Sequence, residues 1–370
     1  MKTKICELLG IEVPILAFSH CRDVIVEVSK AGGMGFLGLA RMPADQLKVE
    51  LQWIDDHIGG KPYGVDVLMP QNYQKLPDVK IGPEDLPQEQ VQYLRKLLDN
   101  AGIPRLPEDD DQAMLRDGLS RVTQTREEEI ALLEIALKHP IKAVVNGLGI
   151  PPKEVIDRLH SRGIKIGSLT GKVEHAIKQK NAGIDFIVAV GTEAGGHTGS
   201  ITSMVLWPQI VDAVAPTPVL AAGGIGGGRQ LAAAMALGAD GIWCGSIWLG
   251  TRESELEPEM KELFWKASSE GTIRTLARSG KPVRMLRSKL TEAWEQPGAP
   301  AYLPMPYQSM VWCEPDLRVR RAKHKDFMSY PVGQIVGSMN EETTCRQVIY
   351  NMMTEFVEAM ERVNRLIATD

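Results

Sequence analysis

A glycine-rich segment with a histidine lies near the middle of the chain and holds its most reactive combination of residues. The run Asp185 to Val190 leads directly into Gly191-Thr192-Glu193-Ala194-Gly195-Gly196-His197-Thr198-Gly199. Gly195 and Gly196 allow the backbone to approach a flat ligand or to adopt positive φ, and the imidazole of His197 can exchange a proton near neutral pH. The pattern predicts a buried strand that opens into an active-site loop, with His197 as the catalytic candidate. The alternative is a glycine-rich turn with an incidental histidine.

A second glycine-rich loop follows the apolar run Pro218 to Ala222 and has the groups needed to bind an anion. Gly223 and Gly224 precede an alanine-rich helical pattern, and the unpaired N–H groups and dipole of a helix start attract phosphate. The next predicted strand ends in Trp243-Cys244-Gly245-Ser246, which supplies another backbone N–H group and a hydroxyl. Loops after the seventh and eighth strands of a barrel commonly bind phosphate. These two segments are therefore predicted to form one phosphate site.

Short apolar runs rich in β-branched residues recur along the first 250 residues, and most gaps between them have a helical pattern. Near-continuous hydrophobicity is typical of parallel strands that are covered on both faces. The repetition predicts an α/β fold of the (β/α)8 or TIM-barrel type, with its active site at the C-terminal ends of the strands. A doubly wound sheet is the alternative, but the late glycine loop lacks the GxGxxG register. The predicted strands are Ile15 to Phe18, Met34 to Leu39, Gly64 to Leu68, Lys142 to Asn146, Ile164 to Ser168, Asp185 to Val190, Pro218 to Ala222 and Asp240 to Gly245.

Two parts of the chain lie outside this repeat. The segment Gln71 to Pro140 is too long for a simple crossover, and helices are predicted over 88–100, 111–122 and 126–139. It is interpreted either as a lid over the barrel mouth or as a peripheral helical excursion. The tail after residue 250 ends in a helix predicted over 341–366. We therefore expect a barrel over 1–250 with a helical insertion over about 71–140. We expect residues 251–370 to form a C-terminal helical extension that packs on the barrel and contributes to a substrate pocket or to a dimer interface.

The composition of the 370-residue chain excludes several classes of protein. With 44% hydrophobic and 24% charged residues and a net charge of -5, it can form a large core and has no basic stripe for nucleic acid. Its five cysteines are scattered without CxxC spacing, which indicates reduced thiols in a cytoplasm and no metal site. No apolar run is long enough for a membrane span. The expected partners are therefore small molecules.

These motifs together resemble the nitronate monooxygenases, formerly called 2-nitropropane dioxygenases, a family of FMN-dependent TIM-barrel oxidoreductases. The family's EAGGHxG signature appears as Glu193 to Gly199, its AAGG loop as Ala221 to Gly224, and its pair of glycine and hydroxyl residues as Gly245-Ser246. Three shorter matches extend the resemblance over nearly the whole chain outside the insertion: Ala31 to Gly35, Thr251 to Glu253 and Gly333 to Gly337.

The resemblance implies FMN-dependent oxidation of alkyl nitronates by O2 to a carbonyl compound and nitrite. His197 is then the base toward a nitroalkane or the hydrogen-bonding partner of the nitronate. An NAD(P)H-dependent FMN reductase of quinones or enoyl thioesters is the alternative enzyme, and a flavin- or metabolite-binding barrel without catalysis is the third hypothesis. The tail is a candidate homodimer surface. The residues expected to bind FMN are Phe18, Ser19, Asp66, Gly195, Gly196, Gly223, Gly224, Trp243, Cys244, Gly245 and Ser246.

The sequence also departs from the family pattern close to the expected flavin. Phe18-Ser19-His20 replaces a small residue, proline and methionine at the end of the first strand, and Val190 replaces a residue that is polar in several members. Asp66 replaces the asparagine of a GVN motif, and a carboxylate cannot donate a hydrogen bond unless it is protonated. We expect its contact with the flavin to differ in kind. His20 and Cys21 are a hypothetical second acid and thiol near the flavin, or else a polar strand end with a buried cysteine.

Overall fold

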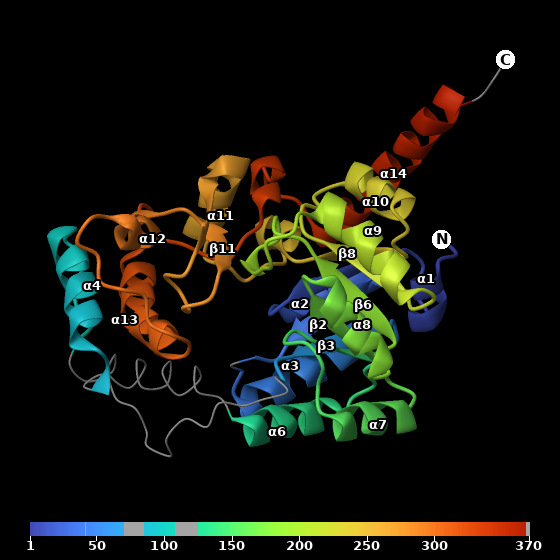
Figure 1. The fold of residues 1–370 in the computed structure, drawn as a ribbon, viewed down its shortest axis with the longest axis horizontal. Helices are drawn as coiled ribbons and strands as arrows, with labels where there is room; N and C mark the ends of the chain where they lie inside the picture. Colours follow the sequence, from blue (N-terminus) through green and yellow to red (C-terminus); the bar gives the residue numbers. More distant parts are fainter. Residues whose placement is uncertain (41, 70–84, 108–124, 368–370) are drawn as a thin grey trace.

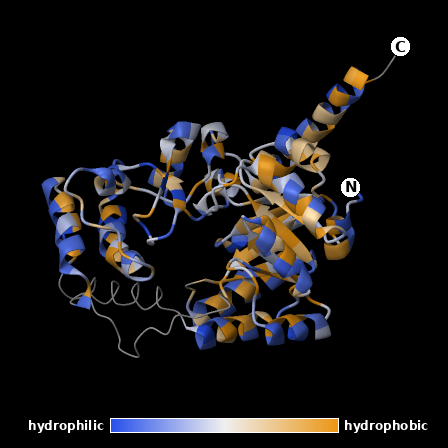
Figure 2. Cartoon of the chain, viewed as in Figure 1, coloured by the Kyte–Doolittle hydropathy of each residue, from blue (hydrophilic) through white to orange (hydrophobic). Residues whose placement is uncertain are grey.

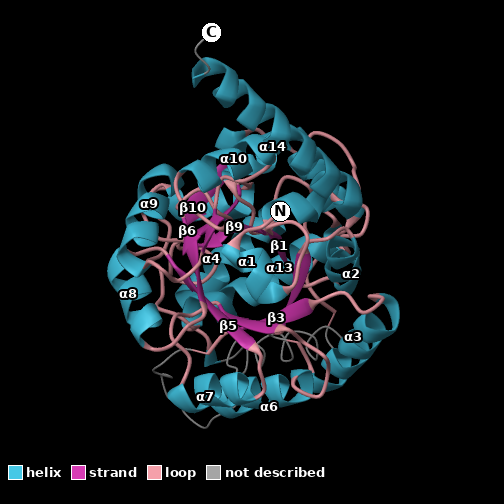
Figure 3. Cartoon of the chain, turned by 90° about the vertical axis from the view of Figure 1, so that its right-hand side faces the viewer, coloured by secondary structure: helices cyan, strands magenta, loops and turns pink. Residues whose placement is uncertain are grey.

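Eight parallel strands close into a barrel in the order in which they occur along the chain, and a ring of helices surrounds them (Figure 3). The computed structural model describes residues 1–40, 42–69, 85–107 and 125–367. The last barrel strand pairs with the first, with Ile242 opposite Ile15. This confirms the predicted (β/α)8 barrel. Its strands are β1 Ile15–Ser19, β2 Met34–Gly38, β3 Tyr63–Val67, β4 Ala143–Asn146, β5 Lys165–Thr170, β6 Phe186–Val190, β8 Val219–Ala222 and β9 Gly241–Cys244.

Side chains alternate along each strand between the barrel interior and the layer beneath the helices, as the two-residue period of a strand requires. Phe36 and Trp243 belong to the interior cluster, with ring centroids 4.9 Å apart. A Cβ atom on Gly64 would lie 2.4 Å from the Phe36 ring, so only glycine leaves room for this aromatic pair. The interior is therefore a packed core, as is usual in this architecture.

The helices that cover the barrel follow the predicted amphipathic segments, each burying its apolar face (Figure 1). Two of the gaps between predicted strands that have a helical pattern, 172–181 and 229–237, form helices α8 and α10. Helix α1 Lys4–Leu9 instead packs its buried residues on the interior cluster at one end of the barrel. The covering helices are α2 Arg22–Lys30, α3 Ala44–His57, α6 Arg126–Ala136, α7 Lys153–Ser161, α8 Val173–Asn181, α9 Ser203–Val214 and α10 Gly228–Ala236.

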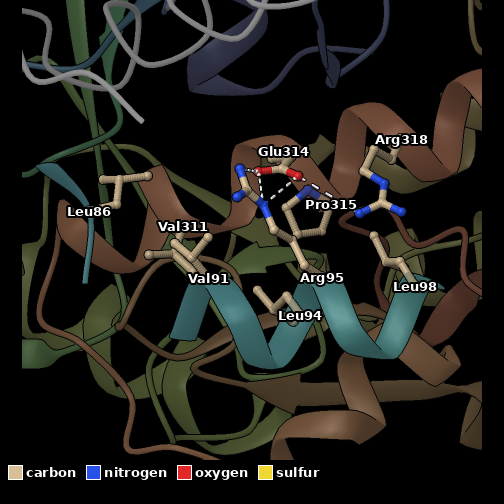
Figure 4. Close-up of a pocket in the computed structure, with 9 residues that line it drawn as sticks. All are labelled: Leu86, Val91, Leu94, Arg95, Leu98, Val311, Glu314, Pro315 and Arg318. Atoms are coloured by element: carbon tan, nitrogen blue, oxygen red, sulfur yellow. Dashed lines mark hydrogen bonds and ion pairs between the residues drawn. The ribbon is translucent and has the colours of Figure 1, made fainter. Parts of the chain in front are cut away.

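The described parts of the insertion lie in two different surroundings. Helix α4 (Gln88–Asn100) confirms the predicted helix over 88–100 and packs against α13 (Tyr307–Ala322), where Arg95 forms a 2.7 Å ion pair with Glu314 (Figure 4). Helix α6 packs instead against α3 and β3. It ends at Ala136, before the predicted boundary, and the chain then tightens into a turn in which the Lys138 N–H donates to the Ile135 carbonyl oxygen and the His139 N–H to the Ala136 carbonyl oxygen. The helix predicted over 111–122 lies outside the described residues.

The C-terminal part of the chain builds on the barrel and on the glycine loop after β6. Two residues of that loop form strand β7 (Gly196–His197), which pairs with β11 in a three-stranded sheet of order β10-β11-β7. The final helix begins at Cys345, later than predicted. The remaining elements are η2 Ser246–Gly250, α11 Pro258–Lys266, η3 Ser269–Gly271, β10 Thr272–Thr275, β11 Val283–Leu286, α12 Lys289–Glu292, η4 Ala293–Glu295, η5 Gln334–Ser338 and α14 Cys345–Ile367.

We predict that Gly228→Ala lowers the free energy of unfolding, because α10 and α14 touch at this glycine. A Cβ atom there would lie 1.9 Å from the Met352 carbonyl oxygen and 2.5 Å from the Phe356 nitrogen. Overpacking of this kind typically costs about 1 to 3 kcal/mol. Urea unfolding checks the prediction, with Gly271→Ala as the control, since its nearest contact would be 3.6 Å away. Equal midpoints for the two variants would contradict it.

Candidate functional site

The predicted site residues come from the same end of the barrel, since the C-terminal ends of parallel strands meet at one mouth. Ser19 is the last residue of β1, and Asp66 is the next-to-last residue of β3. The loop of Gly195 to His197 follows β6. Gly223 and Gly224 follow β8, and Gly245 and Ser246 follow β9. The topology therefore brings segments far apart in sequence to a common rim.

The loop after β6 is held by the C-terminal sheet. His197 lies opposite Val283 in the β7–β11 ladder. Arg284 donates from Nε to the Thr192 carbonyl oxygen at 2.9 Å, and Arg274 donates to the Thr198 carbonyl oxygen at 3.1 Å. Burial lowers the pKa of the Arg284 guanidinium, but the group stays a cation. The tail therefore fixes both ends of the loop that carries the histidine.

His197 is exposed to solvent at the rim, and one of its ring nitrogens has a defined partner. Its Nε2 atom lies 2.7 Å from the Oγ of Ser279, a buried residue of the tail. Because both groups can donate or accept, the hydroxyl can adjust to the tautomer of the ring. Ser279 is 82 residues away in the sequence and belongs to no recognisable motif, so sequence reasoning missed it.

Glu193 anchors the loop and takes no direct part in the rim. Its carboxylate accepts hydrogen bonds from the Ser203 backbone N–H at 3.0 Å and from the Ser203 hydroxyl at 2.9 Å. Ser203 is the first residue of α9, and a carboxylate is stabilised at the N-terminus of a helix. The Ser203 Oγ also lies 3.0 Å from the Gly223 carbonyl oxygen. The acidic residue of the signature therefore ties the loop after β6 to the loop after β8.

The two glycine loops present backbone donors suited to an anion. Gly223 and Gly224 adopt φ of 93° and 72°, which places successive peptide groups in a turn that side-chain-bearing residues rarely adopt. Among the described residues, the backbone N–H groups of Gly224 and Gly245 have no hydrogen-bond acceptor. The Ser246 Oγ accepts from the Gly333 N–H at 2.8 Å, which leaves its own proton able to donate. A phosphate group matches this set of donors.

The start of α10 does not belong to this donor set. The Gly228 backbone N–H donates to a carboxylate oxygen of Glu355 in α14, at 2.7 Å. A carboxylate from another helix therefore occupies the positive end of the α10 dipole. This corrects the expectation that the helix start would attract the phosphate, and it limits the candidate donors to the loops themselves.

Aromatic side chains form the wall of the mouth beside β1 and β9. The Phe18 ring stacks on Trp243, with centroids 6.3 Å apart and an interplanar angle of 26°. His20 is exposed, meets Phe18 edge-on at 5.2 Å, and has its Nδ1 atom 3.1 Å from the Gly38 carbonyl oxygen. This end of the mouth is suited to a flat ring system, because aromatic faces favour stacked contacts.

The two cysteines near these strands lie away from the mouth. Cys244 is in the cluster between the barrel and the helices, and burial raises the pKa of its thiol to about 12. Only its backbone can serve the predicted cofactor site. The Cys21 thiol is buried in the same cluster and donates to the Glu253 carbonyl oxygen at 3.0 Å, and burial raises its pKa as well. The hypothetical pair of His20 and Cys21 is therefore split between two faces.

A pair of buried carboxyl groups, Asp66 on β3 and Glu129 on α6, lies behind the mouth. Their residues are 5% and 3% exposed, and the Glu129 Oε2 atom has no partner among the described residues. The pKa of Glu129 is raised to about 7, chiefly by burial. A hydrogen bond from the Leu68 backbone opposes this increase, and the negative charge of Glu128 adds to it. Burial first, and then the Glu129 charge, raise the pKa of Asp66 well above its usual range. Burial therefore favours the neutral form of both carboxyl groups, and a protonated Asp66 can donate one hydrogen bond.

The chain was compared with known families and proteins. The family model described as nitronate monooxygenase matches residues 7–355. A protein of Mycobacterium tuberculosis named as a candidate monooxygenase, Rv1533, is 44% identical over 99% of this chain and 100% of its own length. A probable nitronate monooxygenase of Staphylococcus saprophyticus is 29% identical over 78% of this chain and 79% of its own.

Two solved structures resemble the chain over almost its full length. A nitroalkane oxidase from Streptomyces ansochromogenes has a TM-score of 0.78 at 26% identity, covering 97% of this chain and 99% of its own. FabK from Thermotoga maritima has a TM-score of 0.74 at 26% identity, covering 99% and 100%. The chain is accordingly an oxidoreductase. Among the described helices none is long and apolar enough to span a membrane, and the described residues contain no cluster of metal-ligating side chains.

We predict that Glu129→Gln stabilises the protein at pH 8 and has little effect below pH 5. Because the pKa of Glu129 is raised in the folded state, the folded chain still holds this proton between about pH 4.5 and 7, whereas the unfolded chain has already lost it. The unfolding free energy of the wild type therefore falls as the pH rises through that window. Glutamine removes this fall, for a gain on the order of 1 to 3 kcal/mol at pH 8. Thermal unfolding from pH 4 to 8 measures it.

The matched control is Glu127→Gln, two residues earlier in the same helix and exposed. Its unfolding free energy should follow the wild-type pH profile within experimental error. A Glu129→Gln profile parallel to that of the wild type would show that Glu129 titrates normally in the folded state.

Proposed function

The chain belongs to the nitronate monooxygenase family, and we propose that it oxidises small alkyl nitronates with O2 to a carbonyl compound and nitrite, using FMN. The observation that carries the proposal is the position of His197. The C-terminal sheet holds this histidine at the rim from which the free backbone donors of Gly224 and Gly245 also extend. A proton-transferring group and an anion site at one barrel mouth fit a flavin enzyme with an anionic substrate.

The residues at the mouth fit FMN. Its phosphate would be held by the backbone N–H groups of Gly224 and Gly245, with Gly223 shaping the turn and the Ser246 hydroxyl as a further donor. When bound, FMN supplies the electron transfer that the side chains cannot perform. Phe18, Ser19, Trp243 and the backbone of Cys244 would lie along one side of the cofactor. Gly196, where an added Cβ would meet nothing within 4 Å, would allow its close approach from the other side, whereas Gly195 packs against the backbone of Val332 and Gly333 in the tail.

Asp66 would serve the cofactor as a neutral carboxylic acid. A protonated carboxyl donates one hydrogen bond, so it can replace the amide donor of the asparagine that the resemblance placed here. Glu129 favours this state because its negative charge opposes ionisation of Asp66. The substitution at this position therefore preserves a hydrogen-bond donor despite the change of residue type.

His197 would act on the substrate through its ring nitrogens. A neutral imidazole can take the proton next to a nitro group, and the resulting cation can hold the nitronate oxygens. Ser279 keeps the ring in one orientation through the 2.7 Å contact with Nε2. The other hydrogen bonds of the Ser279 hydroxyl go to the Lys281 backbone, so Ser279 would act on the substrate only through the histidine and is a positioning residue.

The second candidate function is an NAD(P)H-dependent FMN reductase of quinones or enoyl thioesters. The observation in its favour is the likeness to FabK, which covers as much of the chain as the likeness to nitroalkane oxidase. The cytoplasm is the proposed location, because the five cysteines form no disulfide with one another and four of them are buried. The partners proposed are a small-molecule substrate and O2, and a second copy of the chain in a homodimer.

An anaerobic visible spectrum of the purified protein distinguishes these functions. We expect an alkyl nitronate to bleach the flavin absorbance while NADH and NADPH leave it unchanged, because the nitronate is itself the electron donor. Nitrite release after admission of air provides the second readout. Rapid bleaching by NADH or NADPH with no response to nitronate would favour the reductase, and a colourless protein that binds no added FMN would exclude both.

We predict that His197→Asn lowers kcat/KM for the nitroalkane by about 100-fold or more while the bound FMN remains, because general-base catalysis is typically worth about 10²- to 10⁴-fold. Ser279→Ala should lower the rate less and shift the pH profile of kcat/KM, since the ring loses its partner. Ser279→Thr, which keeps the hydroxyl, should restore the wild-type profile. Loss of FMN in His197→Asn would instead place the histidine in cofactor binding.

A further inference from the structure

Strands β10 and β11, with the turn between them and the three residues that follow, form a stretch with basic residues and no acidic one. Residues 272–289, here called the basic hairpin, contain six arginine or lysine residues, although the whole chain has a net charge of -5. The barrel strands are mainly apolar, whereas the tail beyond them has hydrophilic stretches, coloured blue in Figure 2. The cations of the basic hairpin are Arg274, Arg278, Lys281, Arg284, Arg287 and Lys289. A concentration of one charge attracts ligands of the opposite charge.

Only part of this positive charge is balanced by acidic side chains. Arg287 lies 3.5 Å from Glu292, and Lys289 lies 2.6 Å from Asp326. Among the residues that the structure describes, no carboxylate lies within ion-pair distance of the other four cations. The basic hairpin therefore has an excess of positive charge that the protein itself does not neutralise.

Arg274 on β10 and Arg284 on β11 form a pair of like charges across the two strands. They lie directly opposite each other in the antiparallel ladder, so their side chains extend from the same face, with Cβ atoms about 5 Å apart. Burial lowers the pKa of Arg284, and the charge of Arg274 lowers it further, while the charge of Glu193 opposes both effects. The Glu193 carboxylate bonds to Ser203 and forms no ion pair with either arginine. Like charges placed directly opposite each other destabilise a sheet.

The two arginines extend from the face of the sheet that can receive a ligand. The other face packs on the core shared with α4 through three buried residues, Ile273, Val283 and Met285. On the arginine face, Arg274 is exposed and Arg284 is half-buried. Gly196 of β7 lies opposite Arg284 and continues the row, and an added Cβ atom there would meet nothing within 4 Å. The space beside the pair is therefore open.

Each arginine uses part of its guanidinium group to hold the loop after β6, and this fixes the position of its charge. Arg274 donates from Nε and Nη2 to Thr198. Arg284 donates from Nε to Thr192 and from Nη1 to Thr272. Within the described part of the chain, Nη1 of Arg274 and Nη2 of Arg284 have no acceptor. Two fixed cations with unused N–H groups match the oxygens of a phosphate group.

We propose that Arg274 and Arg284 bind the phosphate group of a small ligand distinct from FMN. This site goes beyond the proposed function, which places the FMN phosphate on Gly224 and Gly245. A doubly charged phosphate between the two guanidinium groups replaces their mutual repulsion by attraction, and it accepts hydrogen bonds from both unused nitrogens. A long polyanion such as a nucleic acid is less suited, because the chain as a whole is acidic.

Isothermal titration calorimetry of the full-length protein with inorganic pyrophosphate tests the site, with and without saturating FMN. We expect the wild type to bind pyrophosphate with the same affinity in both cases. Arg274→Gln should weaken binding by about tenfold or more, because one of two charge-assisted contacts is lost. A wild type that does not bind pyrophosphate, or that loses it when FMN is added, would overturn the proposal. The readout is the heat of binding, so it is independent of turnover.

Two control variants separate the arginine pair from its surroundings. Arg287→Gln removes an exposed cation of the same hairpin that is already paired with Glu292. Thr198→Val removes the hydroxyl that accepts from Arg274 but leaves both charges in place. Both variants should bind pyrophosphate as the wild type does. A loss equal to that of Arg274→Gln in either variant would overturn the proposal, since general surface charge or the loop anchor would then explain the binding.

Two phosphate esters distinguish the sources of the phosphate group. Binding of ADP that depends on Arg274 would identify a nucleotide, and binding of glycerol 3-phosphate that depends on Arg274 would identify a simple phosphate monoester. Both results support the site. Failure of both esters would overturn the proposal, because the arginines would then hold only an inorganic ion.

Discussion

The site depends on one contact, the carboxylate of Glu193 at the N-terminus of α9. This side chain accepts from both the N–H and the hydroxyl of Ser203, and the same hydroxyl lies at hydrogen-bond distance from the Gly223 carbonyl oxygen. The backbone oxygen of Glu193 accepts from Gln334 in the tail at 3.0 Å. The loop after β6, the loop after β8 and the C-terminal region therefore converge on one residue, and the rim can be rigid although it is built from glycine-rich segments.

The C-terminal region contributes directly to the candidate site. It adds strands to the histidine loop, supplies the hydroxyl that contacts His197, and provides the carboxylate that caps α10. It also shares a core with α4, a helix that precedes β4 in the chain. The barrel closes by itself through the β1–β9 pairing, yet the mouth is completed only when the tail has packed on it.

The two kinds of titratable group at the mouth have opposite surroundings. His197 is exposed, where an imidazole can exchange protons with water and substrate, whereas Asp66 and Glu129 are buried, where a low dielectric favours their neutral forms. An acid kept neutral by burial and an exposed base at the same end of the barrel allow the site to donate hydrogen bonds and accept protons at the same pH. The difference in burial, more than the difference in residue type, favours the neutral form of the two carboxyl groups.

The sequence alone determined the strands, most of the covering helices and the two glycine loops, because apolar runs, helical periodicity and glycine signals are local properties of the chain. With parallel strands it also determined that Asp66, Gly224, His197 and Gly245 lie at one end of the barrel. Only the tertiary structure decided that Ser279 contacts His197, that Glu355 occupies the α10 terminus, and that burial changes the protonation of Asp66. These contacts join residues 82 and 127 positions apart, and burial depends on every neighbouring element, so no local pattern encodes them.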